Sequence, residues 1–458
     1  MENPNPGICR LDLALINPGG CGKIYQDLGE LTAIEPPLWC RLIAGYIRDR
    51  GFSVEIIDAQ AEDLTPEQVA ERVDAKLVGM VVYGHQPSAS TQQMSPAFDI
   101  CKAIDTPIVI MGGHVSALPY RTLEEGSVDY VAVGEGVVTV DGLLRGTPLS
   151  DIPGLVWENG ANPRPPLCSA KDLHGDTWDL LPMARYRSHN WQSETRQPYA
   201  SIYTSLGCPY KCSFCCINAP FGGSGYRTRE PDAVVAEVKY LHNEYGVKTF
   251  KIIDEMFVLK PSHYIPICDG LANLNLDLNI WAYARIDTVK PDNLDLLYQA
   301  GIRWLALGIE SGSSYVRDGA DKSFDDKDIN NVVSQIQSAG IKVIGNFIFG
   351  LPDDTLKSME ETYQLAVKLK CDFVNFYSAM GYPGSSLYGL TAGQDLPEDW
   401  SGYSQHAYDT TPLPTATLSS AQVLQFRDNA HNKYFAGNGE LTRPLKRKLL
   451  EQRTTHRL

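Results

Sequence analysis

The sequence lacks any apolar run long enough to cross a membrane, although 43% of its 458 residues are apolar. Its first residues, Met-Glu-Asn-Pro-Asn-Pro, also lack the basic-then-apolar pattern of a targeting peptide. These two absences predict a cytoplasmic protein with no membrane partner. The apolar content is sufficient for large cores, and the length alone predicts two or three domains.

Basic side chains are in deficit as well. The 40 Lys and Arg residues stand against 55 Asp and Glu residues, which gives a net charge of -15. Phosphate binding requires clustered Lys and Arg, so this balance predicts that the protein has no nucleic-acid partner. One basic stretch, residues 443–457, is interpreted as a solvated terminal helix or tail. A patch for an anionic substrate is the alternative.

Cysteine is too sparse for a secreted disulfide scaffold, with 11 residues in the chain. Three of these cysteines nevertheless share one short loop, Cys208-Pro-Tyr-Lys-Cys212-Ser-Phe-Cys215. A structural zinc site normally takes four N or S ligands, and no partner His or Cys pair follows closely. Three thiolates can hold three irons of a [4Fe-4S] cluster and leave the fourth iron open for chemistry. The spacing therefore predicts a cluster, and the adjacent Cys216 is interpreted as a small buried residue, with a stray ligand or a redox reporter as alternatives.

Strand-like and helical patterns alternate through residues 1–145, which predicts a doubly wound parallel sheet. The expected strands are Leu11–Ile16, Val54–Ile57, Leu77–Tyr83, Ile108–Met111 and Val128–Val133. Ligands of such sheets bind at the carboxyl ends of the strands, where glycine lets the backbone approach a large flat cofactor. The candidate residues in these loops are Pro18, Gly19, Gly20, Gly84, His85, Gln86, Gly113, His114, Gly134, Glu135 and Gly136. The alternative is that the glycines only shape turns and that the histidines are satisfied by backbone hydrogen bonds.

Residues 146–197 are rich in proline with little periodicity, which indicates a connection between domains. Within it, residues 178–182 are interpreted either as a passive linker or as a wall of the site. Six strand-and-helix repeats then fill residues 198–390, which predicts a partial (β/α)6 barrel. The expected barrel strands are Ser201–Ser205, Thr249–Ile253, Ile280–Ala284, Trp304–Ile309, Val343–Phe349 and Phe373–Tyr377. Residues 391–458 are expected to form a C-terminal helical extension.

Polar residues recur at the carboxyl ends of the expected barrel strands, where barrel enzymes place their sites. A packed barrel alone does not require this convergence, so it predicts a functional site. The residues are Asp254, Glu255, Arg285, Glu310, Ser311, Asn346 and Tyr377.

The cysteine motif, with Phe214 just before its third cysteine, resembles the signature of radical S-adenosylmethionine (SAM) enzymes. The first domain resembles the cobalamin-binding domain of class B of that family, through Pro36-Pro-Leu38, Met111-Gly-Gly-His114 and Gly134-Glu-Gly136. The resemblance implies three cofactors: a [4Fe-4S] cluster, SAM and cobalamin.

The resemblance also implies roles for single residues. It implies that Phe214 packs near the adenine of SAM and that Asp254 and Glu255 accept hydrogen bonds from its amino group. Glu310 is expected on SAM, and Arg285 is expected on the SAM carboxylate or on a substrate anion. Ser311 and Asn346 are further candidate SAM contacts. The candidate catalytic residues are Arg285 and Tyr377.

One departure from other B12 proteins is informative, because the sequence has no Asp-x-His-x-x-Gly motif. The resemblance then implies cobalamin without its tail base and without a histidine below cobalt, which favours Co(I) and methyl handling. The expected function is reductive SAM cleavage and methylation of an unactivated sp3 carbon in a small molecule or peptide, with an external electron donor such as flavodoxin or ferredoxin. The alternatives are a radical SAM deoxygenase, dehydratase or ring-rearranging enzyme on a sugar- or nucleotide-like substrate, and an iron–sulfur electron carrier. Substrate identity and oligomeric state leave no pattern in the sequence.

Overall fold

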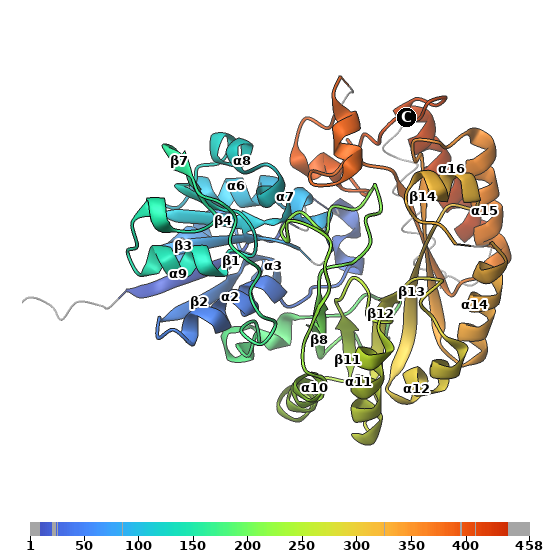
Figure 1. Ribbon diagram of the computed structural model, residues 1–458, viewed down its shortest axis with the longest axis horizontal. Coiled ribbons are helices and arrows are strands. Elements are labelled where there is room, and N and C mark those ends of the chain that lie inside the picture. Colours follow the sequence, from blue (N-terminus) through green and yellow to red (C-terminus); the bar gives the residue numbers. More distant parts are fainter. Residues whose placement is uncertain are drawn as a thin grey trace, which may run out of the picture.

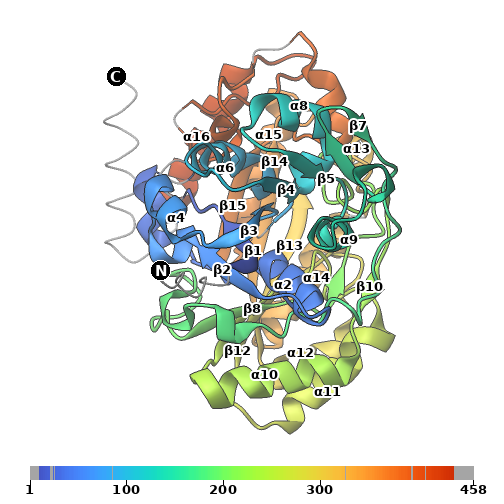
Figure 2. The same cartoon turned by 90° about the vertical axis from the view of Figure 1, so that its left-hand side faces the viewer.

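The computed structural model describes residues 10–20, 24, 26–84, 86–324, 326–393, 396–407 and 409–437. Two sheets, each flanked by helices, stand side by side (Figure 1). Viewed from the side of the first sheet, the first domain lies in front of the barrel strands (Figure 2). None of the helices among the described residues is long and apolar enough to span a membrane.

The first sheet has seven strands in the order β2-β1-β3-β4-β5-β6-β7. Its strands are β1 (Leu11–Asn17), β2 (Val54–Asp58), β3 (Ala75–Val82), β4 (Ile108–Gly112), β5 (Tyr130–Ala132), β6 (Leu155–Trp157) and β7 (Gly160–Ala161). The first five strands pair in parallel, which confirms the predicted fold. The last two are antiparallel and lie in the segment expected to be a plain connection, so the sheet extends beyond residue 145.

The helices of the first domain follow from its apolar periodicity. They are α2 (Leu38–Arg48), α3 (Ala59–Glu62), α4 (Pro66–Arg72), α5 (Ala89–Gln92), α6 (Met94–Lys102), α7 (Gly113–Ala117), α8 (Pro119–Glu125) and α9 (Val137–Leu144). In α2, Leu38, Leu42 and Tyr46 recur at helical spacing, and all three are buried. Gly51 follows the helix with a φ of +86°, a conformation that favours glycine and helps the chain to leave the helix.

The second sheet is the predicted partial barrel, with parallel neighbours in the order β15-β14-β13-β12-β11-β8. Its strands are β8 (Tyr199–Ile202), β11 (Thr249–Ile252), β12 (Asn279–Ala284), β13 (Ile302–Glu310), β14 (Lys342–Phe349) and β15 (Phe373–Ser378). The outer helices are α10 (Pro231–Tyr245), α11 (Pro261–Asn273), α12 (Leu294–Gln299), α14 (Asp326–Ser338) and α15 (Leu356–Leu369) (Figure 1). Helix α10 begins at a proline and ends at Gly246, whose φ is +68°. A small antiparallel pair, β9 (Ser205–Leu206) and β10 (Arg227–Thr228), flanks the cysteine loop.

Aromatic side chains fill the barrel near the amino ends of its strands. Trp191, from the connecting segment, lies with its ring centroid 5.6 Å from that of Trp281 and 4.9 Å from that of Trp304. Phe373 stacks against the indole of Trp191, with ring centroids 5.6 Å apart. These rings pack the amino-terminal part of the barrel, so space for ligands is expected at the carboxyl ends.

The C-terminal segment contacts both domains. Helix α16 (Ser420–Gly437) packs against β15 and α15. The short 3-10 helix η7 (Trp400–Tyr403) instead packs against α5 and α6 of the first domain. There Trp400 Nε1 donates a hydrogen bond of 2.7 Å to Glu125, and its ring meets His114 edge-on at 4.5 Å.

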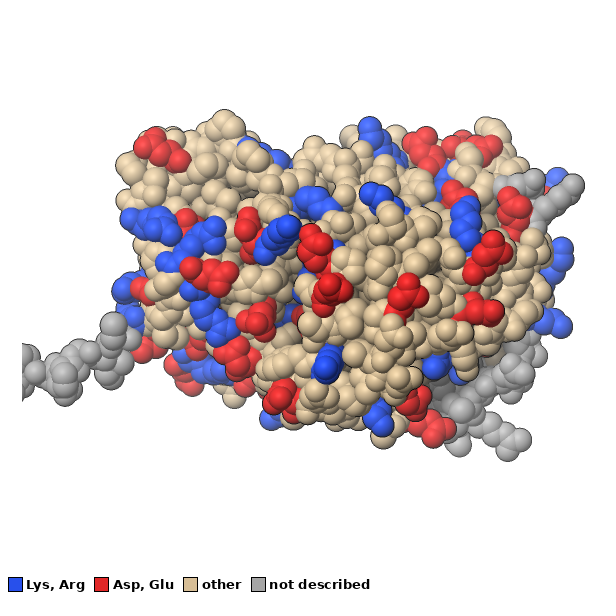
Figure 3. Space-filling view, turned by 60° about the horizontal axis from the view of Figure 1, so that its bottom comes forward, with Lys and Arg blue, Asp and Glu red and all other residues tan. Residues whose placement is uncertain are grey.

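The surface charges are mixed. Lys and Arg side chains alternate with Asp and Glu on the face that Figure 3 shows. Among the described residues, no patch of one charge dominates this face, and the absence of a nucleic-acid partner stays a prediction.

Candidate functional site

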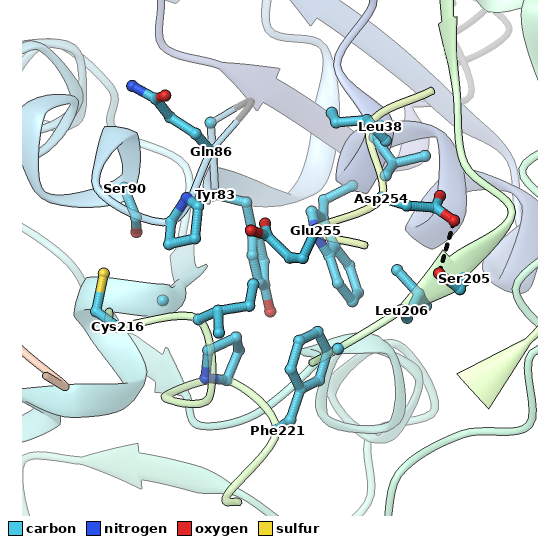
Figure 4. A pocket seen from close by; sticks show the side chains of 18 residues that line it. Leu38, Tyr83, Gln86, Ser90, Ser205, Leu206, Cys216, Phe221, Asp254 and Glu255 are labelled. Carbon is cyan, nitrogen blue, oxygen red and sulfur yellow. Dashed lines mark hydrogen bonds between the residues drawn. The ribbon is translucent and has the colours of Figure 1, made fainter. Parts of the chain in front are cut away.

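A cavity that opens to solvent lies between the first domain and the barrel (Figure 4), and its space together with the adjoining open solvent is about 600 Å³. The first domain contributes Leu38, Trp39, Tyr83, Gly84, Gln86, Pro87, Ser90 and Gly113. The barrel side contributes Ser205, Leu206, Gly207, Cys216, Ile217, Pro220, Phe221, Ile253, Asp254 and Glu255. Loops after β3 and β4 thus face loops after β8, β9 and β11, so the carboxyl ends of both sheets meet at one space.

Part of the cavity lining is flat and aromatic. Trp39 and Tyr83 stack with ring centroids 4.3 Å apart, and Phe221 lies 6.3 Å from Trp39. The hydroxyl of Tyr83 donates a hydrogen bond of 2.6 Å to the carbonyl of Gly134, which fixes its ring. Stacked rings with a satisfied hydroxyl offer an apolar surface to a large planar ligand.

Three of the predicted cobalamin contacts lie in this lining: Gly84, Gln86 and Gly113. At Gly113 a Cβ atom would meet only ordinary contacts, 3.5 Å from Ser90 Oγ and 3.8 Å from Pro220. A side chain there would therefore be tolerated by the fold and would occupy the cavity instead. His85 lies outside the described residues.

The other predicted loop residues lie outside the lining. A Cβ at Gly19 would come 2.9 Å from the backbone of Gln60, and one at Gly20 would come 2.4 Å from Pro96. Both glycines thus let β1 turn closely past α3 and α6, and Pro18 precedes them in that turn. Gly134 accepts the Tyr83 hydroxyl, and Gly136, with φ +82°, precedes α9.

His114 and Glu135 are held by partners far away in the sequence. His114 Nδ1 lies 3.2 Å from Thr91 Oγ1, and burial lowers the pKa of the imidazole to about 3, so it is neutral. Glu135 accepts hydrogen bonds from Arg227 at 2.6 Å and from the Cys168 amide at 2.8 Å. Neither side chain lines the cavity. Sequence patterns could not show these partners, because they come from other elements.

The three motif cysteines lie in one loop after β9, and all three are free thiols. The Cys215 amide donates to the Cys212 carbonyl at 3.0 Å, and the Gly225 amide donates to the Cys208 carbonyl at 3.2 Å. Burial raises the pKa of Cys208 to about 11 and also raises the pKa values of Cys212 and Cys215. Thiols in such a site lose their protons when they bind a metal, because the metal stabilises the thiolate.

Within the described ranges, no three His, Cys, Asp or Glu side chains converge on a site for a single metal ion. A cubane cluster makes a different demand, because each cysteine binds its own iron. Three free thiols on one loop meet that demand. Cys216 is not part of this set: it is buried, it lines the cavity, and burial raises the pKa of its thiol to about 12.

Asp254 and Glu255 are neighbours with different environments. Asp254 accepts hydrogen bonds from the Thr204 amide and from Ser205 Oγ, both at 2.6 Å. Glu255 points into the cavity (Figure 4) and, within the described part of the chain, has no hydrogen bond or ion pair. Burial raises the pKa of Glu255 to about 7. Asp254 therefore shapes the wall, whereas Glu255 presents a carboxyl group to a ligand.

Glu310 ends β13 and forms a buried ion pair with Lys322, a residue that the sequence analysis missed. Lys322 Nζ also lies 5.7 Å from the centre of the Phe214 ring. A Cβ at Gly308 would come 2.3 Å from Lys322 Nζ, so glycine makes room for the pair. Lys322 follows Glu310 by 12 positions without any periodic pattern, so only the fold brings the two charges together.

Ser311 directly follows this strand and is fully buried. Its hydroxyl lies 3.1 Å from that of Thr362, and its carbonyl accepts a 2.6 Å hydrogen bond from the buried Arg317. These contacts hold the turn in which Glu310 has a φ of +64°. Ser311 therefore holds the backbone turn that carries Glu310.

Arg285 directly follows β12, whereas Asn346 lies on β14 and Tyr377 lies on β15. Arg285 Nε donates to Asp287 at 2.9 Å, and its Nη1 lies 3.9 Å from Cys212 Sγ. Asn346 donates to the Leu307 carbonyl at 3.3 Å and accepts from the Asn375 amide at 2.9 Å. Burial, together with nearby Glu310, raises the pKa of Tyr377. The structure thus brings Arg285 to the cysteine loop and Tyr377 near Glu310.

Two segments of the chain match two known families. Residues 202–366 match the Radical SAM superfamily, and residues 27–144 match the B12 binding domain. An uncharacterized methyltransferase of Pyrococcus horikoshii is 31% identical over 389 residues, which cover 81% of this chain and 82% of the relative. The anaerobic magnesium-protoporphyrin IX monomethyl ester cyclase of Rubrivivax gelatinosus is 25% identical, over 78% of this chain and 67% of its own length.

Solved structures share the fold. The radical SAM methyltransferase TsrM from Kitasatospora setae, with cobalamin and a [4Fe-4S] cluster bound, aligns with a TM-score of 0.65 and 19% identity. That alignment covers 84% of this chain and 78% of TsrM. The cobalamin-dependent SAM radical enzyme OxsB, with aqua-cobalamin and SAM bound, aligns with a TM-score of 0.66 and 14% identity, over 97% and 70% of the two chains.

The fold and the cysteine loop define the class of radical SAM enzymes with a B12-binding domain, and the chain belongs to this family. Within the family it is a cobalamin-dependent radical SAM methyltransferase. The two family matches imply SAM and cobalamin as cofactors, and the cysteine loop is the candidate ligand set for the [4Fe-4S] cluster.

Proposed function

We propose that this enzyme methylates an unactivated sp3 carbon of a small molecule or peptide. The observation that carries the proposal is the cavity between the B12-binding loops and the barrel. Its lining includes Cys216, which directly follows the last cysteine of the cysteine loop. A substrate in this space would lie between the two reactive cofactors. Similar chains are named as a hopanoid C-3 methylase and as a bacteriochlorophyllide d C-12(1)-methyltransferase, at 25% and 26% identity, which supports a small-molecule substrate.

The cysteine loop and the end of β13 suit a cluster and SAM. Cys208, Cys212 and Cys215 would hold the cluster. The ion pair of Glu310 and Lys322 presents one carboxylate and one ammonium group side by side, which complements the zwitterion of an amino acid such as SAM. A cluster held by these cysteines would supply the electron for reductive cleavage of SAM, and bound cobalamin would supply the methyl group.

The first-domain wall suits a corrin without a ligating histidine. The stacked Trp39 and Tyr83 are flat and apolar, and the described residues of the lining include no histidine. Gly84 and Gly113 would let the backbone approach the corrin ring. The role of these side chains would be to seat the corrin and to exclude water from the space above it.

Glu255 and Tyr377 are the side chains proposed to meet the substrate or SAM. Glu255 can accept a hydrogen bond from an amino or hydroxyl group in the cavity, because no described residue already occupies it. Tyr377 can position a ligand beside Glu310. An external electron donor, such as flavodoxin or ferredoxin, would reduce the cluster.

The test combines cofactor binding with product analysis. The anaerobically reconstituted protein should bind hydroxocobalamin at micromolar concentration, with a spectrum showing the tail base displaced. With methyl-labelled SAM, a reductant and the substrate, label should enter the product, with one deoxyadenosine and one S-adenosylhomocysteine formed per product. Failure to bind cobalamin would overturn the methylation proposal. Deoxyadenosine without S-adenosylhomocysteine, with a product that has lost water or oxygen, would support a deoxygenase or dehydratase.

A further inference from the structure

Arg285 is a buried cation aimed at a proposed cluster ligand. It follows β12 at the carboxyl end of the barrel and is 5% exposed. Its Nη1 donates to Cys212 Sγ over 3.9 Å, a long hydrogen bond to sulfur. Its guanidinium carbon also lies 4.0 Å from the centre of the Tyr210 ring, and Tyr210 stands between Cys208 and Cys212 in the sequence.

The orientation of Arg285 is fixed from three sides. Asp287 accepts from Nε at 2.9 Å and from Nη2 at 3.2 Å, so one edge of the guanidinium is fully used. The backbone amide and carbonyl of Arg285 both bond the Thr288 hydroxyl, at 3.1 and 3.0 Å. The guanidinium thus donates from one edge to Asp287 and from Nη1 to Cys212, so it is directed at the cysteine loop. Lys322, paired with Glu310, is the cation better placed for SAM.

We propose that Arg285 sets the reduction potential of the cluster through its hydrogen bond to Cys212. The inference rests on the proposed binding of a [4Fe-4S] cluster by this loop. Reduction adds one electron from an external donor to the cluster, and the added negative charge spreads onto the thiolates. A cation with an N–H directed at one thiolate stabilises the reduced state more than the oxidised state, so it raises the potential. Asp287 moderates this effect because its carboxylate balances part of the positive charge.

Arg285 would therefore act through Cys212 as a positioning residue, and it would not touch the reacting atoms. Its effect would be to make the cluster easier to reduce by a weak donor, in a site where burial disfavours additional charge. A role on SAM or on a substrate anion predicts a different outcome, because loss of Arg285 would then weaken ligand binding and leave the potential of the SAM-free cluster unchanged.

The experiment is a redox titration of reconstituted full-length protein, followed by electron paramagnetic resonance, without SAM. Arg285→Met should keep its iron, and reduction of its cluster should require a lower potential. A tenfold loss in the equilibrium constant for reduction corresponds to about 59 mV for one electron. Asp287→Asn should move the potential upward, because it releases the full charge of the guanidinium. Arg285→Lys should lie between Arg285→Met and the native protein.

Lys290→Met is the matched control, since Lys290 is an exposed cation whose Nζ donates to the Asp287 carbonyl at 3.3 Å. Solvent screens its charge, so its removal should leave the potential unchanged. Retained iron with an unchanged potential in both Arg285→Met and Asp287→Asn would overturn the inference. If Arg285→Met loses its iron, the directions in which the reduction potential shifts in Arg285→Lys and Asp287→Asn decide instead. A native protein that binds no iron would contradict the proposed function itself.

Discussion

Glu135 Oε1 accepts a 2.6 Å hydrogen bond from Arg227 Nη2, which ties the loop after β5 to strand β10 beside the cysteine loop. The second oxygen of Glu135 accepts from the Cys168 amide, so the connecting segment joins the same contact. The carboxylate is nearly buried, with 4% of its side chain exposed, whereas the Arg227 side chain is 21% exposed. One carboxylate therefore links three parts of the chain around the cavity.

Loss of this link should destabilise the interface between the two domains. Arg227→Gln leaves the Glu135 carboxylate buried without its cation, and breaking a buried pair in this way costs about 3 to 5 kcal/mol. The partial exposure of Arg227 places the expected loss near the lower end of that range. Urea unfolding would measure it. Arg145→Gln, which breaks an exposed pair with Asp141, should leave the unfolding midpoint unchanged, and equal losses in both variants would contradict the assignment.

The cysteine loop gives a direct prediction about iron. Anaerobic reconstitution should give about four irons per chain. Cys208→Ala, Cys212→Ala and Cys215→Ala should each lose the cluster and reductive SAM cleavage, whereas Cys216→Ala should keep both. Iron analysis and chromatography of deoxyadenosine measure the two effects. Reductive SAM cleavage by Cys212→Ala would show that the ligand assignment is wrong.

Gly113 allows a test of the proposed cobalamin site that spares the fold. A side chain at this position meets ordinary contacts at its Cβ and then extends into the cavity, so Gly113→Leu should fold and bind iron normally. Its affinity for hydroxocobalamin should fall at least tenfold, or about 1.4 kcal/mol. Gly223→Leu is the control, because a Cβ there has no neighbour within 4 Å. Native affinity in Gly113→Leu would place the corrin elsewhere.

The raised pKa of Glu255 predicts how its substitution changes stability with pH. The folded state holds the proton up to about pH 7, against a usual value of 4.5, so the folded state binds more protons between those values. Stability contributed by the protonated group is complete below about pH 4.5 and is lost as the pH rises through about 7. Glu255→Gln should therefore gain stability relative to the native protein as the pH rises across this window. After allowance for partial exposure, the gain is about 1 to 3 kcal/mol.

Urea unfolding of the cofactor-free protein at about pH 4.5 and about pH 8 measures this difference. Glu158→Gln, at an exposed turn outside the cavity lining, is the control for the same chemical change. A constant difference between Glu255→Gln and the native protein at both pH values would mean that folding does not shift the pKa of Glu255. A neighbour in solution would then offset the effect of burial on its carboxylate.

Much of the fold could be predicted because apolar periodicity is local. Strands such as β4 and β14 begin and end within a few residues of their expected bounds. The short strands β6 and β7 were missed because three or two residues carry no alternation that can be measured. The placement of the cysteines in one loop was also visible, since it depends only on spacing along the chain.

The environments of single side chains could not be predicted in the same way. Asp254 and Glu255 are adjacent in the sequence, yet one is saturated by Thr204 and Ser205 and the other faces the cavity. Lys322 reaches Glu310 only because a turn held by Arg317 brings it back to β13. Such contacts depend on how loops fold over one another, and no periodic pattern encodes them.

The contact between Trp400 and the first domain has a consequence for the order in which the protein matures. Ribosomes release the first domain long before residues 396–407, and domains generally fold as they emerge. At that stage His114 lacks its aromatic neighbour, and the cavity has only one of its two walls. Enclosure of a corrin at the proposed site would therefore require the finished polypeptide. A cofactor captured during synthesis would meet only the first-domain part of the lining, which includes the stacked rings of Trp39 and Tyr83.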